Sequence, residues 1–159
     1  MRLREAILAD LPRLSREADD LGRINIQNGT KGGRAGATAP RWISVDNHVR
    51  GALEFARQVS PAGSPSLIAA HESYLTTLQA ILRPARDILH AHNLKGFHEL
   101  RAAYASNCYE QITQHPAPIN GGLCCQKDRN LDHEARRQIS YGLGHGRIDV
   151  VAAYIGGRS

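Results

Sequence analysis

Apolar residues recur at intervals of three and four along most of the chain, which is the spacing of one helix face. Asp46 suits a helix N-cap, and the apolar positions after it predict a helix that Pro61 ends. A longer helix is predicted to open at 64–66 and to reach about residue 82, and a further helix covers roughly 97–113. The three apolar stripes consist of Val49, Ala52, Leu53, Ala56 and Val59; of Leu67, Ile68, Tyr74, Leu75, Leu78, Ile81 and Leu82; and of Leu100, Ala103, Tyr104, Cys108 and Ile112.

The first 45 residues carry shorter patterns. Residues 2–14 predict a short helix followed by a polar, partly extended stretch, because a proline in this segment is unfavourable inside a helix. Ile24 and Ile26 alternate with polar neighbours, as in a half-buried strand. Residues 28–36 hold four glycines and predict a turn or hairpin tip, from which residues 37–45 return as a second strand.

The last third of the chain is interrupted by an irregular loop at 114–132, rich in Pro, Gly and Asn. Two short helices follow, at about 133–142 and 149–155, with glycines between them. Together the elements predict an α+β fold that is mostly helical, with one small antiparallel sheet near the N-terminus. The length suits one domain that covers residues 1–159.

Composition narrows the classes of function. Lys and Arg number 20 against 15 Asp and Glu, so the net charge is +5, and a basic chain of this kind is attracted to polyanions. The three cysteines are an odd number without a C-x-x-C spacing, which argues against a disulfide framework or a zinc site and favours a reducing cytoplasm. No stretch reaches the ~20 apolar residues of a membrane span, and the N-terminus lacks the apolar run of a signal peptide.

A lone tyrosine, Tyr154, stands in an apolar segment nine residues after His145. Such a tyrosine is usually a core aromatic. His98 and Arg101 are three residues apart, which places them on one face of the predicted helix, but a solvated surface explains that pair equally well. Each residue taken singly is weak evidence for a site, so the evidence lies in their order and spacing.

Two positions near the N-terminus complete this order. Arg2 has Glu5 at the third position after it, and Lys31 stands in the predicted hairpin tip. The ordered set resembles the catalytic domain of the tyrosine recombinases, the phage-integrase family. That family's pattern is an arginine in a G-L-R-x-x-E segment, a lysine on a β-hairpin, H-x-x-R, L-G-H and a tyrosine nine residues later. The matching residues are Arg2, Lys31, His98, Arg101, His145 and Tyr154.

The resemblance spans residues 2–154 and is nearest to a bacterial integrase-like branch. In that branch H-x-x-R continues as R-x-x-Y-A, found here at 101–105, and a Pro/Gly-rich insert precedes L-G-H, here at 114–132. The leading glycine of the first segment is absent. We also expect the chain to lack the N-terminal core-binding domain with which the family usually clamps the other side of the DNA.

The resemblance implies cleavage and rejoining of DNA strands in site-specific recombination or integration. It makes Tyr154 the nucleophile, which forms a 3′-phosphotyrosyl bond. Arg2 and Arg101 would clamp the non-bridging oxygens of the scissile phosphate, and Lys31 would protonate the leaving 5′-hydroxyl. The two histidines of the set fill the remaining catalytic positions.

The residue types suit this chemistry. A phosphodiester gathers charge on its non-bridging oxygens in the transition state, and guanidinium groups stabilise such charge without losing a proton. A tyrosine hydroxyl is mostly protonated at neutral pH, so positioning and a nearby base must assist it. Because arginines supply the positive charge, we expect neither a metal nor a cofactor. The expected partners are double-stranded DNA and other recombinase protomers at the bacterial nucleoid, with no membrane contact.

Two alternatives remain open. The chain can be an inactive or truncated integrase remnant that only binds DNA or a protein partner, or a relaxing topoisomerase with similar chemistry. The remaining basic residues are expected on solvated faces, with phosphate contacts as the alternative. They include Arg34, Arg41, Lys127, Arg136, Arg137 and Arg147.

Overall fold

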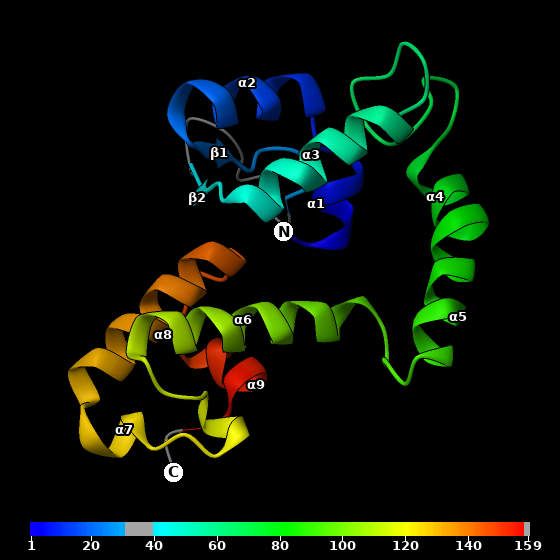
Figure 1. The fold of residues 1–159 in the computed structure, drawn as a ribbon. Coiled ribbons are helices and arrows are strands. Elements are labelled where there is room, and N and C mark those ends of the chain that lie inside the picture. The colour runs from blue at the N-terminus through cyan, green and yellow to red at the C-terminus, as the bar shows by residue number, and fades with distance from the viewer. Residues whose placement is uncertain (31–39, 158–159) are drawn as a thin grey trace. The chain divides into compact units, whose positions relative to one another are not determined.

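The computed structural model describes residues 1–30 and 40–157, apart from the side chain of Cys125 (Figure 1). The described chain is mostly helical with one two-stranded antiparallel sheet near the N-terminus, which confirms the predicted α+β class. It forms two compact units, Met1–Ile88 and Leu89–Ser159. No helix in the described part is long and apolar enough to cross a membrane. The assignment of residues 1–159 to one catalytic domain stays a prediction.

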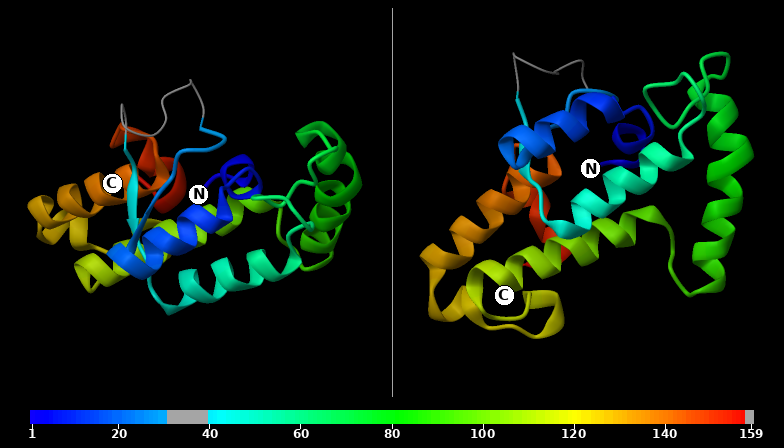
Figure 2. Two further views of the ribbon diagram at one scale, coloured as in Figure 1. Left: turned by 90° about the horizontal axis from the view of Figure 1, so that it is seen from above. Right: turned by 45° about the horizontal axis from the view of Figure 1, so that its top comes forward.

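The first unit packs two helices and the small sheet around one apolar core (Figure 2). Strand β1 pairs with strand β2 so that Ile24 lies opposite Ile43. Leu14, Ile24 and Leu53 are buried in the core, which joins the sheet to two helices. The elements are α1 (Leu3–Ile7), α2 (Leu11–Leu21), β1 (Arg23–Asn25), β2 (Trp42–Ser44), α3 (Asn47–Val59), α4 (Tyr74–Thr77), the π-helical η1 (Leu78–Leu82) and α5 (Arg83–Ala91), which runs past the unit boundary.

The predicted polar, partly extended stretch near the N-terminus is wrong, because it forms most of α2. Pro12 lies in the first turn of this helix, where a missing backbone N–H costs nothing. The carboxylate of Asp10 accepts a hydrogen bond from the backbone N–H of Arg13 at 3.0 Å and caps the helix. The helix ends at Gly22, whose φ of +61° is in the left-handed region that favours glycine.

The helix predicted to follow Pro61 starts later and ends later than expected. Its N-cap is Ser73, whose hydroxyl accepts from the N–H of Thr76 at 3.2 Å. The preceding segment instead makes backbone bonds to α1 and α2. Leu67 donates to the carbonyl of Ile7 at 3.2 Å, and Pro65 accepts from the N–H of Leu11 at 2.8 Å. These contacts with distant segments outweigh the helical stripe.

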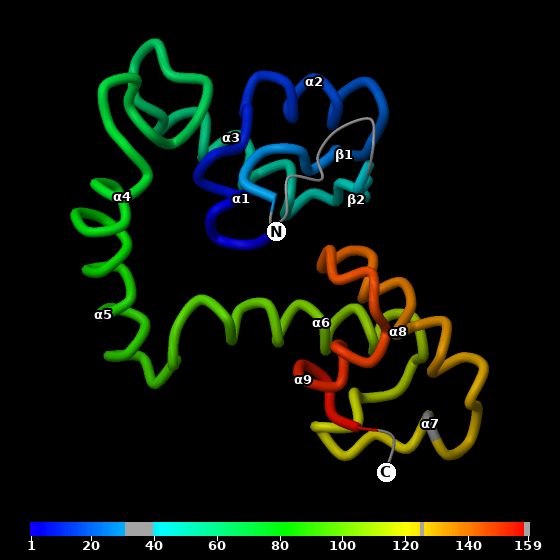
Figure 3. The backbone as a smooth tube through the Cα atoms, turned by 180° about the vertical axis from the view of Figure 1, so that it is seen from behind, coloured from blue at the N-terminus to red at the C-terminus, as the bar shows by residue number. Residues whose placement is uncertain are grey.

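The second unit is helical, and α6 lies against both α8 and α9 (Figure 3). Its core includes Tyr109, Leu143 and Ile155, all nearly or fully inaccessible to solvent. The predicted helix 97–113 is confirmed, whereas the helix predicted at 133–142 begins four residues earlier, because Asp128 caps it by accepting from two backbone N–H groups. The elements are α6 (Phe97–Thr113), the 3₁₀-helical η2 (Pro118–Asn120), α7 (Cys124–Lys127), α8 (Arg129–Leu143), the 3₁₀-helical η3 (Asp149–Val151) and α9 (Ala152–Ile155).

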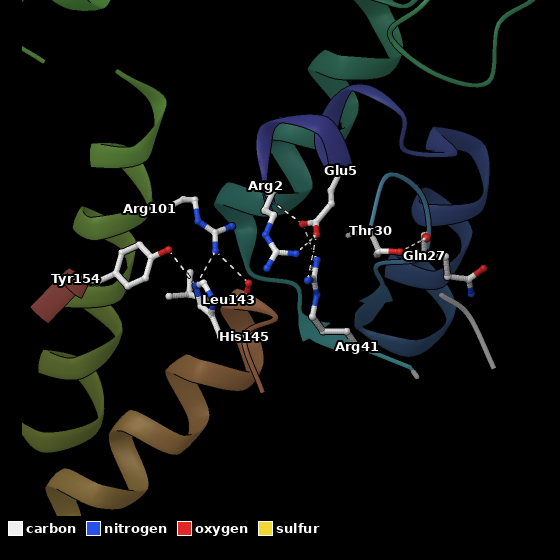
Figure 4. A network of polar contacts seen from close by, with 9 residues as sticks. All are labelled: Arg2, Glu5, Gln27, Thr30, Arg41, Arg101, Leu143, His145 and Tyr154. Carbon is white, nitrogen blue, oxygen red and sulfur yellow. Dashed lines mark hydrogen bonds and ion pairs between the residues drawn. The ribbon is translucent and has the colours of Figure 1, made fainter. Parts of the chain in front are cut away.

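A buried carboxylate, Glu5, ties the start of the first unit together (Figure 4). Its two oxygens accept from both terminal nitrogens of Arg41, at 3.2 and 2.6 Å. Glu5 also accepts from the backbone N–H and the guanidinium of Arg2, at 2.6 and 3.2 Å. Burial would raise the pKa of Glu5, but the hydrogen bonds from Arg41 and Arg2 and their charges outweigh it and lower the pKa.

We expect Glu5→Gln to destabilise the first unit by about 3 kcal/mol, because it leaves a buried guanidinium without its counter-charge. Since the folded-state pKa of Glu5 lies below its usual 4.5, the stabilisation is complete above that value and is lost as pH falls through the lower folded pKa. Urea unfolding followed by the fluorescence of Trp42, the single tryptophan, measures both effects. Glu54→Gln, at an exposed carboxylate of α3, is the control. Equal stability of the two variants at pH 7 would contradict the role given to Glu5.

Candidate active site

The first turns of α6 present two of the predicted site residues. Gly96, at φ +140°, leads the chain into the helix, and α6 begins at Phe97. His98 lies in the first turn and Arg101 three residues later, so the two side chains share one face of α6. The prediction that H-x-x-R lies on a helix is therefore met by the described structure.

The end of α8 meets this face of α6. Gly144 terminates α8 at φ +70°, and the backbone N–H of His145 donates back to the carbonyl of Ser140 at 3.0 Å. This termination turns the chain so that His145 leaves the helix. The guanidinium nitrogen Nη2 of Arg101 donates to the carbonyl of Leu143 at 3.0 Å, so the last turn of α8 fixes the arginine of α6 (Figure 4).

The short helix α9 delivers Tyr154 to the same place. Its hydroxyl oxygen lies 2.9 Å from Nε2 of His145. The Tyr154 ring lies 4.9 Å from the ring of His98 and 5.4 Å from the ring of His145, centroid to centroid, and Cζ of Arg101 lies 5.8 Å from its centroid. Tyr154 is 5% exposed and Ile155 beside it is fully buried, so the ring is part of the core while the hydroxyl meets polar groups.

The neighbours of His145 determine which way the hydrogen bond to Tyr154 runs. Nε2 of His145 also lies 3.5 Å from Nη2 of Arg101, at the limit of a hydrogen bond. A guanidinium can only donate. A proton on Nε2 would therefore face another donor, whereas a proton on Nδ1 leaves Nε2 free to accept. We infer that the ring proton of His145 is on Nδ1 and that the Tyr154 hydroxyl donates to Nε2.

The guanidinium of Arg101 has unused hydrogen-bonding capacity. Its Nη1 is buried and has no hydrogen-bond partner among the described residues. Buried donors in folded proteins nearly always have partners, and an unpaired one on a charged group costs free energy. Such a donor, on a guanidinium that also lies beside His145 and the ring of Tyr154, is suited to bind an anionic oxygen.

The structure brings four of the six predicted residues together in the second unit: His98, Arg101, His145 and Tyr154. Arg2 belongs to the first unit, where its backbone and guanidinium bind Glu5. Lys31 lies outside the described residues. The roles of all six remain predictions.

Two arginines expected on solvated faces are buried, so that expectation is wrong for Arg41 and Arg136. Arg41 is neutralised by Glu5, and Arg136 by Asp132, whose carboxylate accepts from its Nε at 2.8 Å. Sequence reasoning assigned no role to Asp132. The available signal was the spacing of four residues between Asp132 and Arg136 on a helix, but most such pairs are solvated.

Comparison with known proteins identifies no family for this geometry. No family model, no curated protein and no solved structure matches the chain. Within residues 1–30 and 40–157, no group of three or more His, Cys, Asp or Glu side chains is arranged to hold a metal ion. The chemistry of the site therefore has to be inferred from the four side chains themselves.

We expect nitrogen NMR of the histidine rings to show His145 protonated on Nδ1 at neutral pH, because Nε2 accepts from Tyr154. In Tyr154→Phe the Nε2 resonance should move by several ppm, because Nε2 loses the hydrogen bond that it accepts from the hydroxyl. Tyr141→Phe, on an exposed face of α8, is the matched control and should leave the His145 resonances unchanged. A ring protonated on Nε2 would refute the inferred direction of the hydrogen bond.

Proposed function

We propose that this chain cleaves and rejoins DNA strands as a tyrosine-type site-specific recombinase, through a 3′-phosphotyrosyl intermediate. The observation that carries the proposal is the 2.9 Å contact between the hydroxyl of Tyr154 and Nε2 of His145, with Arg101 beside both. A nucleophile hydrogen-bonded to a base, with a positive donor next to them, is an arrangement suited to phosphoryl transfer through a covalent intermediate.

In the proposed first step, the oxygen of Tyr154 attacks the phosphorus of a DNA phosphodiester. Nε2 of His145 takes the hydroxyl proton, because it is the acceptor 2.9 Å away. The bond from phosphorus to the 5′-oxygen breaks, and that oxygen leaves as a hydroxyl after it receives a proton, a role we assign to Lys31. Rejoining reverses these transfers, with a 5′-hydroxyl as the nucleophile and the tyrosine oxygen as the leaving group.

Charge in the transition state gathers on the two non-bridging oxygens. Nη1 of Arg101 is the donor we assign to one of them, since this buried atom has no partner among the described residues. We assign Arg2 to the same phosphate on the sequence resemblance alone. His98, whose ring lies 4.9 Å from that of Tyr154, is a second polar group next to the nucleophile.

The competing function is DNA or partner binding without turnover. The net charge of +5 supports DNA binding by either kind of protein. The tyrosine–histidine contact favours the enzyme, because DNA binding alone does not require a buried tyrosine hydroxyl to donate to an imidazole.

We expect the chain to form a covalent adduct with a nicked double-stranded DNA substrate that loses its short 5′-hydroxyl strand after cleavage. The adduct should survive denaturation and form in the presence of a chelator, because guanidinium groups carry the charge. Tyr154→Phe should abolish it while DNA affinity stays the same. Arg101→Ala should slow it about 10²–10³-fold, the usual cost of losing one such donor.

Arg137→Ala, at an exposed arginine of α8, should form the adduct at the wild-type rate and controls for the loss of one positive charge. An adduct that persists in Tyr154→Phe would identify another nucleophile and refute the proposal. DNA binding without an adduct in the wild-type chain would favour the binding-only function.

We expect DNA binding to be weak and strongly salt-dependent, because it relies on a modest net charge. The logarithm of the affinity should fall with the logarithm of salt concentration by about 0.9 for each neutralised phosphate. A fluorescence anisotropy titration at several salt concentrations measures the slope. Tight binding that does not change between low and moderate salt would contradict an electrostatic mode of binding.

A further inference from the structure

One face of α8 carries a buried polar stripe: Asp132, Arg136 and Ser140, four residues apart in turn. The three are 1, 3 and 2% exposed, on a helix face that also contributes apolar residues to the core. Buried charge is costly unless it is paired and hydrogen-bonded, so the partners of these side chains indicate what the stripe does.

The stripe binds both ends of the segment that carries the nucleophile. Ser140 donates through its hydroxyl to the carbonyl of Arg147 at 2.9 Å. Arg136 donates through Nη1 to the carbonyl of Gly156 at 3.0 Å, and more weakly through Nη2 to the carbonyl of Gly157 at 3.5 Å. Residues 147 and 156 thus bracket η3 and α9, and both are held through their main chain.

The side chain of Arg136 is itself fixed by a hydrogen-bonded carboxylate. Its Nε donates to an oxygen of Asp132 at 2.8 Å, and the same oxygen accepts from the hydroxyl of Tyr109 on α6 at 2.8 Å. Tyr109 is fully buried. Its pKa is raised, mainly by burial and secondly by the hydrogen bond to Asp132. The guanidinium fork is therefore fixed by two helices before it meets α9.

The contact with Gly156 is sterically close on its other side as well. Gly156 has φ +89°, and a Cβ there would lie 2.9 Å from the backbone nitrogen of Ile119 in η2. Only glycine allows the chain to pass between η2 and the guanidinium of Arg136 in this conformation. The end of α9 is thus fixed two residues after Tyr154.

We propose that Arg136 is a positioning residue for Tyr154: it holds α9 docked on its own chain and so keeps the tyrosine hydroxyl at His145. The role of Arg136 in docking α9 is inferred from the contacts described above. Its role in DNA cleavage rests on the proposed function. Arg136 does not touch the reacting atoms, since its contacts are with Asp132 and with main-chain carbonyls beyond the tyrosine.

The test compares Arg136→Gln with Arg137→Gln by hydrogen exchange and mass spectrometry. The amides of 152–156 should exchange about 10–100-fold faster in Arg136→Gln, because a charge-assisted hydrogen bond that closes the segment is lost. The amides of α6 should keep their protection. Arg137→Gln, next to it on α8 but paired with Glu134 at the surface, should match the wild type.

Gly156→Ala tests the same contact from the opposite side, with Arg136 and Asp132 intact. It should speed exchange in 152–156 in the same way, because the added Cβ displaces the chain from η2. If Arg136→Gln does not fold, Gly156→Ala still tests whether this contact docks α9. Arg136→Lys, which keeps the charge but not the fork, should recover part of the protection.

The function is read separately as the rate of covalent adduct formation on saturating nicked DNA. In Arg136→Gln this rate should fall by up to about 10²-fold, with DNA affinity unchanged, because a nucleophile displaced from its position loses attack geometry. In Arg136→Lys the rate should partly recover. Wild-type exchange in 152–156 of both Arg136→Gln and Gly156→Ala would overturn the proposal, as would faster exchange with an unchanged adduct rate. If the exchange results hold but the wild-type chain forms no adduct, the recombinase function fails and the docking role of Arg136 stands.

Discussion

The need of a buried guanidinium for hydrogen-bond acceptors governs both units of this protein. In the first unit Arg41 is matched by both oxygens of Glu5, and in the second Arg136 is matched by Asp132 and by the carbonyl of Gly156. Arg41 joins two segments that are distant in sequence. Arg136 binds the residue that follows the short helix α9. In each unit the chain supplies acceptors at the place where the guanidinium is buried.

Arg101 differs from these two arginines in a way that bears on function. Among the described residues no carboxylate faces it. Its Nη2 donates to the carbonyl of Leu143 and approaches His145, while Nη1 has no partner. Arg41 also has one buried nitrogen without a partner among the described residues, its Nε, but both its terminal nitrogens bind the carboxylate of Glu5. The absence of a facing carboxylate is therefore what distinguishes Arg101 from the two structural arginines. This contrast adds to the case made by the tyrosine–histidine contact.

Capping residues and apolar spacing predicted those helices whose ends depend on residues close by in the sequence. Asp46 caps α3 as expected, its carboxylate accepting from Val49 at 2.8 Å, and the stripe of α6 gave both its ends. The segment after Pro61 was mispredicted, because its backbone binds Ile7 and Leu11, more than 50 residues away in sequence. Such long-range backbone bonds leave no periodic trace in the sequence.

The candidate site was predictable only in part, and for a different reason. The sequence identified four residues of the site by their order and spacing: His98, Arg101, His145 and Tyr154. The contacts among their side chains became known only from the structure of the second unit. Asp132 and Arg136 were missed because a carboxylate and a guanidinium four residues apart look the same on a solvated helix as on a buried one. Lys31 lies outside the described residues, so its assignment depends on the pattern alone.

The division of Tyr154 between a buried ring and a hydroxyl at His145 has a consequence for how such a protein changes over generations. Selection for a folded chain retains an aromatic ring at this position, because the core needs its volume. On the proposed function, selection for chemistry would retain one oxygen atom on that ring. When the second pressure is relaxed, a single-base change from tyrosine to phenylalanine removes the oxygen and spares the ring. Descendants without the hydroxyl could therefore keep the same fold, and the shape of the molecule alone would not reveal the loss of that oxygen.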